Sequence, residues 1–257
     1  MIVAKNITKV FGENQVLNGI SAEFQKGKTN LIIGQSGSGK TVFLKCLIGL
    51  YHPTSGEIFY DGVSGQSMSF KEQKKLRSEI GMVFQGSALF DYMTVKENVM
   101  FPLKMFTDKT AGEMLHRVEE VLERVELTKA IDKLPSELSG GMQKRVAIAR
   151  AIVNNPKYLF CDEPNSGLDP KTSIVIDNLI SEITKEYNTT TIINSHDMNS
   201  VIEIGETIVY LRFGDKVWEG TNIDLLSTND ENILDFVYSS NIMKRLREER
   251  MKREGKL

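Results

Sequence analysis

The residue types with the clearest chemistry form a glycine-rich loop near the N-terminus. The loop reads Gly34-Gln35-Ser36-Gly37-Ser38-Gly39-Lys40-Thr41. This is the G-x-x-x-x-G-K-[ST] spacing of a P-loop, whose glycines let backbone N–H groups turn inward around a phosphate chain. Lys40 supplies a cation for the β and γ phosphate oxygens, and the Thr41 hydroxyl is placed to ligate Mg²⁺. The spacing therefore predicts a site for a phosphate chain with Mg²⁺.

Two acidic residues in the second half of the chain could complete such a site. Asp162 and Glu163 directly follow the apolar run 158–161. A carboxylate at the end of a buried strand is costly unless it is paired or binds a metal. We therefore expect Asp162 to be a direct or indirect partner of Mg²⁺, and Glu163 to be the base or polariser for an attacking water. The alternative, a helix N-cap, fits Asp169 better because it precedes Pro170.

A histidine follows a third strand-like run. His196 comes after the β-branched run 189–195, and 33 positions after Glu163. A lone histidine would be weak support for a site, but its place at the end of a strand predicts a contact with the terminal phosphate. Since the carboxyl ends of parallel strands bind ligands in open α/β sheets, the ends of 29–33, 158–161 and 189–195 are expected to converge.

A second anion-binding feature opens a predicted helix in the middle of the chain. It reads Leu138-Ser139-Gly140-Gly141-Met142-Gln143. Two glycines expose N–H groups, Ser139 adds a hydroxyl, and the helix dipole adds a positive end. A P-loop protein already has one phosphate site. The second site therefore suggests that two chains share their nucleotides, each contributing a different half.

The elements that must position these groups alternate between short strands and helices, which predicts an α/β fold with a largely parallel core sheet. Residues 2–11, 16–25 and 56–61 instead resemble hairpin-connected strands. Helical periodicity runs through about 87–137, with one apolar face at 111–125. Another helix is expected from Ser139 to a point before Asn155, and residues 42–50 are expected as a buried helix after the P-loop.

Composition is that of a folded globular protein. Hydrophobic residues make up 40% and charged residues 26% of the 257, too apolar for a disordered chain. Thirty-two Lys and Arg against 34 Asp and Glu give a net charge of −2, which argues against a globally basic nucleic-acid binder. Two cysteines, Cys46 and Cys161, exclude a disulfide framework or a Cys-based zinc site. No apolar run reaches about 18 residues, so any membrane role must come through partners.

The order of the motifs resembles the ATP-binding cassette of ABC proteins. In chain order they are the P-loop, Gln85, Leu138-Ser139-Gly140-Gly141, Asp162-Glu163, Ser166-Gly167-Leu168-Asp169 and His196. The resemblance covers about residues 1–238. It implies ATP and Mg²⁺, a RecA-like P-loop core, an antiparallel β-subdomain and an inserted helical subdomain at about 87–137. It also implies a head-to-tail homodimer with two ATP molecules in its interface.

The resemblance also assigns roles that the spacing alone does not. Phe11 matches the aromatic residue that stacks on adenine, where Tyr is usual; the alternative is a core aromatic on the first hairpin. Gln85 matches the residue that senses Mg²⁺ and water and links to the membrane partner. Asp169 matches the loop that crosses the dimer interface.

A narrower resemblance is to the ATPases of lipid transporters that work with mammalian-cell-entry (MCE) domain proteins of the Mla type. It rests on 84–103 and on Gly140-Gly141-Met142-Gln143-Lys144-Arg145-Val146. Many importers of small polar solutes carry Gln where this chain has Met142. The resemblance implies phospholipid transport in a bacterial envelope, with an integral membrane permease and an MCE-domain partner, from the cytoplasmic face of the membrane.

Other functions remain open at this point. An importer ATPase for amino acids or another polar solute is one alternative, and an ATPase of iron–sulfur assembly is another. DNA-repair and translation ATPases of this family usually carry coiled-coil insertions, zinc-binding Cys pairs or tandem cassettes, which this chain lacks. The charged tail 239–257 predicts a helix that is either solvated, docked on a partner cassette or accessory subunit, or in contact with anionic lipid headgroups.

Overall fold

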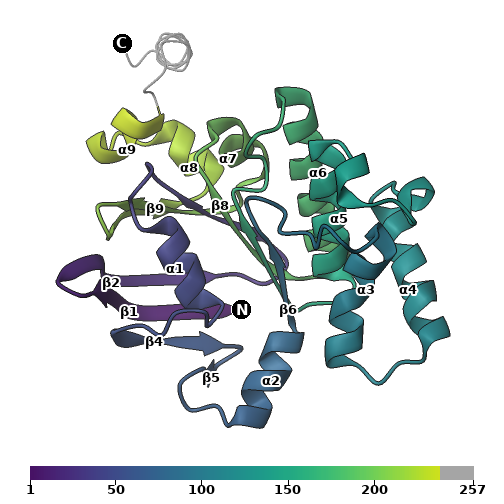
Figure 1. The fold of residues 1–257 in the computed structure, drawn as a ribbon. Helices are drawn as coiled ribbons and strands as arrows, with labels where there is room; N and C mark the ends of the chain where they lie inside the picture. Colours follow the sequence, from purple (N-terminus) through teal and green to yellow (C-terminus); the bar gives the residue numbers. More distant parts are fainter. Residues whose placement is uncertain (238–257) are drawn as a thin grey trace.

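The fold is built on a six-stranded sheet (Figure 1). The computed structural model describes residues 1–237, and the predicted tail at 239–257 lies outside them. The strand order is β10-β9-β3-β8-β7-β6. The strands are β3 (Thr29–Ile33), β6 (Ile80–Val83), β7 (Tyr158–Asp162), β8 (Thr190–Ser195), β9 (Thr207–Arg212) and β10 (Asp215–Gly220). Only β10 pairs antiparallel within this sheet. The parallel core and the three strands predicted from apolar runs are confirmed.

Both faces of this sheet are covered, which explains why its central strands are continuously apolar or β-branched. Every residue of β3, β7 and β8 is buried. Successive residues point to opposite faces. Leu31 and Ile33 therefore join the cluster that contains Val146 and Ile180, while Ile32 joins the cluster that contains Phe43 and Leu44.

A second sheet is antiparallel and lies on the other side of α1 (Lys40–Leu47) (Figure 1). Its order is β2-β1-β4-β5. The strands are β1 (Ile2–Phe11), β2 (Asn14–Phe24), β4 (Ser55–Tyr60) and β5 (Val63–Ser64). The three predicted strands are confirmed to within two residues, and β4 pairs with β1. The prediction of a helix to residue 50 is wrong: α1 ends at Leu47, Gly49 has a φ of 75°, and Leu50 is 59% exposed.

The remaining helices follow local signals closely. They are α2 (Phe70–Ser78), α3 (Val95–Phe106), α4 (Ala111–Arg124), α5 (Gly140–Ile152), α6 (Pro170–Glu186), α7 (Met198–Ile204), α8 (Asn222–Ser227) and α9 (Glu231–Val237), with 3₁₀ turns at Thr128–Ala130 and Pro135–Glu137. Thr94 and Thr110 cap α3 and α4 through capping boxes with the glutamate three residues on, which satisfies free N–H groups at each start.

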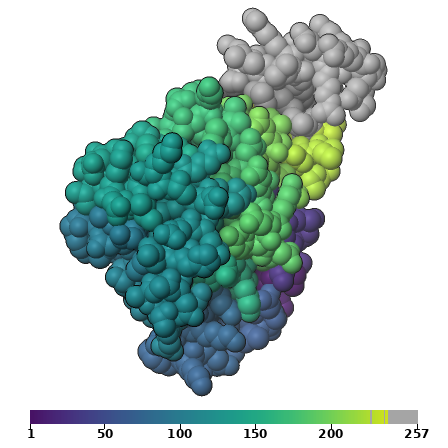
Figure 2. Space-filling view, turned by 90° about the vertical axis from the view of Figure 1, so that its right-hand side faces the viewer, coloured from purple at the N-terminus to yellow at the C-terminus, as the bar shows by residue number. Residues whose placement is uncertain are grey.

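The helical segment begins later than its periodicity predicted. Ser87 and Ala88 have φ values of 62° and 47°, a left-handed conformation that no helix of L-residues continues. The first helix of the segment therefore starts only at Val95. Its helices α3 and α4 pack with α5, and Figure 2 shows them in teal beside the blue residues of α2. Within residues 1–237, no helix is long and apolar enough to cross a bilayer.

One buried side chain ties the start of β3 to its surroundings. Asn30 is fully buried. Its Oδ1 accepts a hydrogen bond from the Gln25 N–H at 2.8 Å, and its Nδ2 donates to the carbonyls of Gln25, Lys28 and Thr191 at 2.9–3.0 Å. The side chain therefore satisfies backbone groups on both sides of the strand that leads into the P-loop.

We expect Asn30→Ala to lower the free energy of unfolding by about 2–3 kcal/mol, because buried backbone groups lose their partners. Urea unfolding followed by circular dichroism measures this. Asn14→Ala, at an exposed hairpin position, is the control and should change stability by no more than about 0.5 kcal/mol. Equal effects of the two substitutions would contradict a stabilising role for the Asn30 network.

Candidate functional site

The P-loop is a tight turn between β3 and α1. Gly34, Gly37 and Gly39 have φ values of 151°, 80° and 101°. A Cβ atom on Gly34 would collide with the Leu211 carbonyl and the Ser38 hydroxyl, so this position has no space for a side chain. Because such a conformation strains other residue types, these glycines leave the backbone free to curve around an anion.

Lys40 lies inside this curve. Its side chain is buried, and its Nζ donates to the carbonyls of Gly34 at 2.8 Å and Gln35 at 3.0 Å. Burial lowers the pKa of Lys40, while the nearby carboxylates of Glu163 and Asp162 act in the opposite direction. The buried Ser38 hydroxyl has no hydrogen-bond partner within residues 1–237. Buried polar groups are normally satisfied, so this hydroxyl and the Lys40 cation fit a phosphate as their missing partner.

The predicted magnesium residues lie together at the ends of β7 and α1. The Thr41 hydroxyl donates to Asp162 Oδ1 at 3.3 Å. Asn194, at the end of β8, donates its Nδ2 to the same oxygen at 2.9 Å. The sequence analysis missed Asn194, although it lies in the run 189–195 and its register pairs it with Asp162.

This donor set suits a hard cation. Hydroxyl, carboxylate and amide oxygens from Thr41, Asp162 and Gln85 are the ligands that Mg²⁺ takes, usually with several waters and phosphate oxygens in addition. No group of three or more His, Cys, Asp or Glu side chains that could hold a metal occurs in residues 1–237. The residues present therefore fit Mg²⁺ that arrives with a phosphate chain, rather than a closed protein cage.

Glu163 joins two of the other predicted residues. Its carboxylate accepts from Gln85 Nε2 at 3.0 Å through Oε2, and its Oε1 lies 3.2 Å from His196 Nδ1. The Gln85 amide also donates to Ser166 Oγ at 3.3 Å. Glu163 has a φ of 46°, a rare backbone state that occurs at functional sites. Three residues up to 111 positions apart thus meet beside the P-loop end of the sheet.

The second anion-binding feature is also formed, but apart from the first. Ser139 is the N-cap of α5, and its exposed hydroxyl accepts from the Met142 N–H at 3.4 Å. Gly140 and Gly141 lie beside Leu168 and Thr172. Asp169 caps α6 by accepting from the Thr172 N–H at 3.0 Å. No hydrogen bond joins the first turn of α5 to the P-loop within the described chain.

The aromatic residue assigned to adenine is on the surface. Phe11 is 42% exposed, so the alternative of a core aromatic is wrong. Its ring packs edge-on against Tyr51 with centroids 5.4 Å apart, and Lys9 Nζ lies 4.9 Å from its centroid. Tyr51, which was not predicted from the sequence, lies four residues after the end of α1, and Lys45 Nζ on α1 lies 5.5 Å from its ring centroid. Phe11 is thus available for stacking near the helix that carries the P-loop.

Comparisons with known proteins agree with this geometry. Residues 17–166 match the family described as ABC transporter. The chain is 42% identical to the methionine import ATP-binding protein MetN of Carboxydothermus hydrogenoformans, covering 88% of this chain and 67% of that protein. It is 36% identical to the phosphonates import ATP-binding protein PhnC of Wolinella succinogenes, covering 96% of this chain and 91% of that protein.

A solved structure shares the fold. The dimeric structure of a post-hydrolysis state of the ATP-binding cassette MJ0796, bound to ADP and Pi, superposes with a TM-score of 0.78 at 35% identity, covering 86% of this chain and 99% of that chain. The chain therefore belongs to the ATP-binding cassettes of ABC transporters. It is an ATPase that binds ATP with Mg²⁺, and cassettes of this family form dimers and work with a membrane permease.

The contacts of Lys40 predict a loss of nucleotide affinity in Lys40→Ala. Removing a charge-assisted contact of about 1.5–3 kcal/mol should weaken ATP binding by about 10–100-fold. Isothermal titration calorimetry with Mg-ATP measures the change. Lys71→Ala, which removes an exposed lysine on α2, is the control and should bind as the parent does. Parental affinity in Lys40→Ala would rule out the proposed place of the phosphates.

Proposed function

We propose that the chain is the motor subunit of an ABC transporter, in which two copies bind two ATP molecules head to tail. The observation that carries this proposal is the division of the phosphate-binding groups into two exposed half-sites, the P-loop and the first turn of α5. In a head-to-tail dimer, the P-loop of one copy faces Ser139 and Gly140 of the other. ATP would then favour the closed dimer, because it adds contacts that only the closed state makes.

For the hydrolysis step, we assign roles to the three residues around Glu163. The Glu163 carboxylate takes a proton from the attacking water, and the Gln85 amide, 3.0 Å away, orients the water and the carboxylate. His196 contacts the γ-phosphate, and Lys40 balances its charge. Thr41, Asp162 and Gln85 would hold Mg²⁺, which would neutralise charge on the phosphate chain. Positioning and electrostatics therefore carry the reaction, without a covalent intermediate.

Glu163→Gln should slow ATP turnover by about 10²–10⁴-fold, the contribution typical of a positioned base. Because the amide keeps the size of the carboxylate, ATP binding should persist and the protein should elute as a dimer with ATP in size-exclusion chromatography. Steady-state phosphate release measures the rate. Turnover at the parental rate would reject Glu163 as the base.

Two further variants provide a control for Glu163→Gln and a test of the shared sites. Glu203→Gln is the matched control, because Glu203 lines the same cavity as Glu163 but has no proposed role in hydrolysis. Ser139→Arg added to Glu163→Gln should abolish the ATP-dependent dimer, since the bulky cation blocks the half-site that receives the other copy's ATP. A persistent dimer in the double variant would contradict the shared sites.

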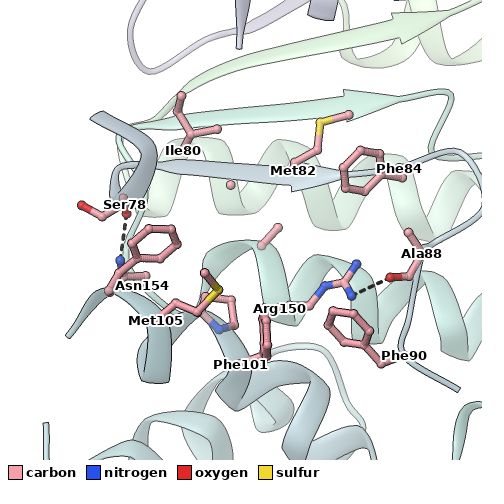
Figure 3. Close-up of a pocket in the computed structure, with 14 residues that line it drawn as sticks. Ser78, Ile80, Met82, Phe84, Ala88, Phe90, Phe101, Met105, Arg150 and Asn154 are labelled. Atoms are coloured by element: carbon pink, nitrogen blue, oxygen red, sulfur yellow. Dashed lines mark hydrogen bonds between the residues drawn. The ribbon is translucent and has the colours of Figure 1, made fainter. Parts of the chain in front are cut away.

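We propose that the permease binds in an apolar groove. It has a volume of about 260 Å³ between β6, the 84–90 segment, α3 and α5. Figure 3 shows Phe90, Phe101 and Met105 beside it, and Met82 and Phe84 of the opposite wall also line it. The Phe90 and Phe101 ring centroids are 4.9 Å apart, and buried Asn98 holds the Phe90 backbone N–H at 2.8 Å. We propose that a short permease helix at the cytoplasmic face of the membrane occupies this groove.

For the cargo, we propose a glycerophospholipid or similar amphiphile moved between bacterial envelope membranes with an MCE-domain partner and, if the complex has one, an accessory subunit. The support is the resemblance of residues 84–103 and of the Met142 region to the ATPases of such systems. The second candidate is import of a small polar solute. It is favoured by the similarity to proteins named for methionine and phosphonate import.

The permease-binding groove and the lipid cargo can be tested together. The chain is purified with its membrane partners in mild detergent, and the proteins and lipids are identified by mass spectrometry. We expect a permease, an MCE-domain protein and bound phospholipid. Met105→Glu, which puts a charge at an exposed groove position, should reduce recovery of the permease by about tenfold or more, since burying an unpaired carboxylate is costly.

Ile223→Glu is the control, because Ile223 is an exposed apolar residue on α8. Full recovery of the permease with Met105→Glu would contradict the groove as its seat. Recovery of a permease with a periplasmic solute-binding protein, and without an MCE-domain protein or lipid, would reject the lipid cargo in favour of the polar-solute importer.

A further inference from the structure

The segment 85–88 connects the hydrolysis site to the groove and has an unusual backbone. Gln85 contacts Glu163 at one end, and Ala88 lines the groove at the other. Between them, Ser87 and Ala88 are consecutive non-glycine residues with positive φ. Such residues persist only where surrounding contacts hold them. Contacts from outside the segment must therefore hold the backbone of 85–88 in this conformation.

Two cations of α5 bind the carbonyl groups of this segment. Lys144 Nζ donates to the Gln85 carbonyl. Arg150 donates to the Ser87 carbonyl through Nη2 and to the Ala88 carbonyl through Nη1, both at 2.7 Å. Figure 3 shows the Arg150 guanidinium directed at Ala88 across the groove wall. Because a guanidinium is planar and has a fixed fork, it holds two acceptors in one relative orientation.

Neither cation has the partner that a buried charge usually has. Lys144 is 4% exposed, and burial lowers the pKa of Lys144 and of Arg150. The nearby Asp162 and Glu163 carboxylates partly offset this lowering of the Lys144 pKa without reaching ion-pair distance. Within residues 1–237, neither side chain forms an ion pair with a carboxylate. An apolar side chain would fill the same space without the cost of burying a charge. The two cations are thus placed to hold carbonyl oxygens, and packing alone does not account for them.

The same helix begins at the second half-site. α5 runs without a break over Gly140–Ile152, with Ser139 as its N-cap. At a rise of about 1.5 Å per residue, Lys144 lies about 7.5 Å and Arg150 about 17 Å along the axis from Ser139. If the first turn of α5 moves, the rigid helix therefore moves Lys144 and Arg150 with it.

We propose that Lys144 and Arg150 are positioning residues that make the segment 85–88 move with α5. The inference rests on the proposed roles of Ser139 and Gln85. When the other copy's ATP binds the first turn of α5, the helix moves. The Lys144 contact then shifts Gln85 relative to Glu163, and the Arg150 contacts shift the groove wall at Ser87 and Ala88. One helix thus couples the ATP of one copy to the hydrolysis site and the permease groove of the other.

The first measurement is amide hydrogen exchange of the peptide 84–93 in the full chain. In Lys144→Met and in Arg150→Lys, which keeps the charge but loses the fork, exchange should rise by about tenfold or more. Arg117→Met is the matched control: Arg117 also donates to carbonyls of α5, at Ile152 and Val153, but not to 85–88. Exchange at the parental rate in a folded Lys144→Met or Arg150→Lys protein would overturn the proposal.

The second measurement is ATP turnover in a double-mutant cycle with Gln85→Ala. Lys144→Met should lower kcat by about tenfold with KM for ATP within about twofold, and should lower it no further when Gln85→Ala is already present. Lys144→Arg should recover most of the rate. Additive losses would overturn the proposal, because Lys144 would then act without Gln85.

The two measurements separate the possible failures. Parental turnover in Gln85→Ala would reject the proposed role of Gln85, while the exchange of 84–93 would still decide whether the cations hold the segment. If Lys144→Met does not fold, as judged by circular dichroism, Arg150→Lys carries the exchange measurement and Lys144→Gln, which also removes the cation, carries the cycle.

Discussion

The parallel pairing of β3, β8 and β7 is the constraint on which the rest of the site depends. Its register sets Ile33 opposite Ser195 and Asp162 opposite Asn194. The P-loop, Asp162, Glu163 and His196 therefore leave the sheet at one edge, although they come from three distant parts of the chain. A slip of one residue in this pairing would turn every side chain to the opposite face. Because both faces of these strands are buried, such a slip would disrupt close packing on both sides of the sheet.

The protein repeatedly satisfies buried cations with carbonyl oxygens instead of carboxylates. Lys40 is held by Gly34 and Gln35, Lys144 by Gln85, and Arg150 by Ser87 and Ala88. A carbonyl stabilises a cation without neutralising it, so the Lys40 charge stays available for a phosphate. The same chemistry fixes backbone position where Lys144 and Arg150 contact the chain. Charge is thus used for binding at Lys40 and for backbone geometry at Lys144 and Arg150.

Several features make sense only for a protein that works with partners. The Ser139 side chain is exposed and accepts a hydrogen bond from Met142, and Gly140 and Gly141 lie beside Leu168 and Thr172. The groove at Met105 is apolar and open, whereas the helices around it are well capped and packed. A second copy and a permease helix would bury these surfaces. The family supplies both kinds of partner. Ser139 caps the start of α5, and Arg150, which lines the groove, lies near its end, so the two surfaces lie at opposite ends of this helix.

Sequence by itself determined the features that depend on local interactions or on motif spacing. It predicted the P-loop, the three apolar strands, the α4 periodicity and the Ser139 cap, because neighbouring residues produce each of them. Only the tertiary structure decided that Asn194 bonds Asp162, that Tyr51 packs on Phe11, and that α5 clamps residues 85–88. It also ended α1 at Leu47 and delayed the first helix of the middle segment to Val95. The first three features depend on strand register and on side-chain contacts between residues about 30–60 positions apart, for which periodicity carries no signal. The two helix boundaries are set by positive φ at Gly49 and by the Thr94 cap.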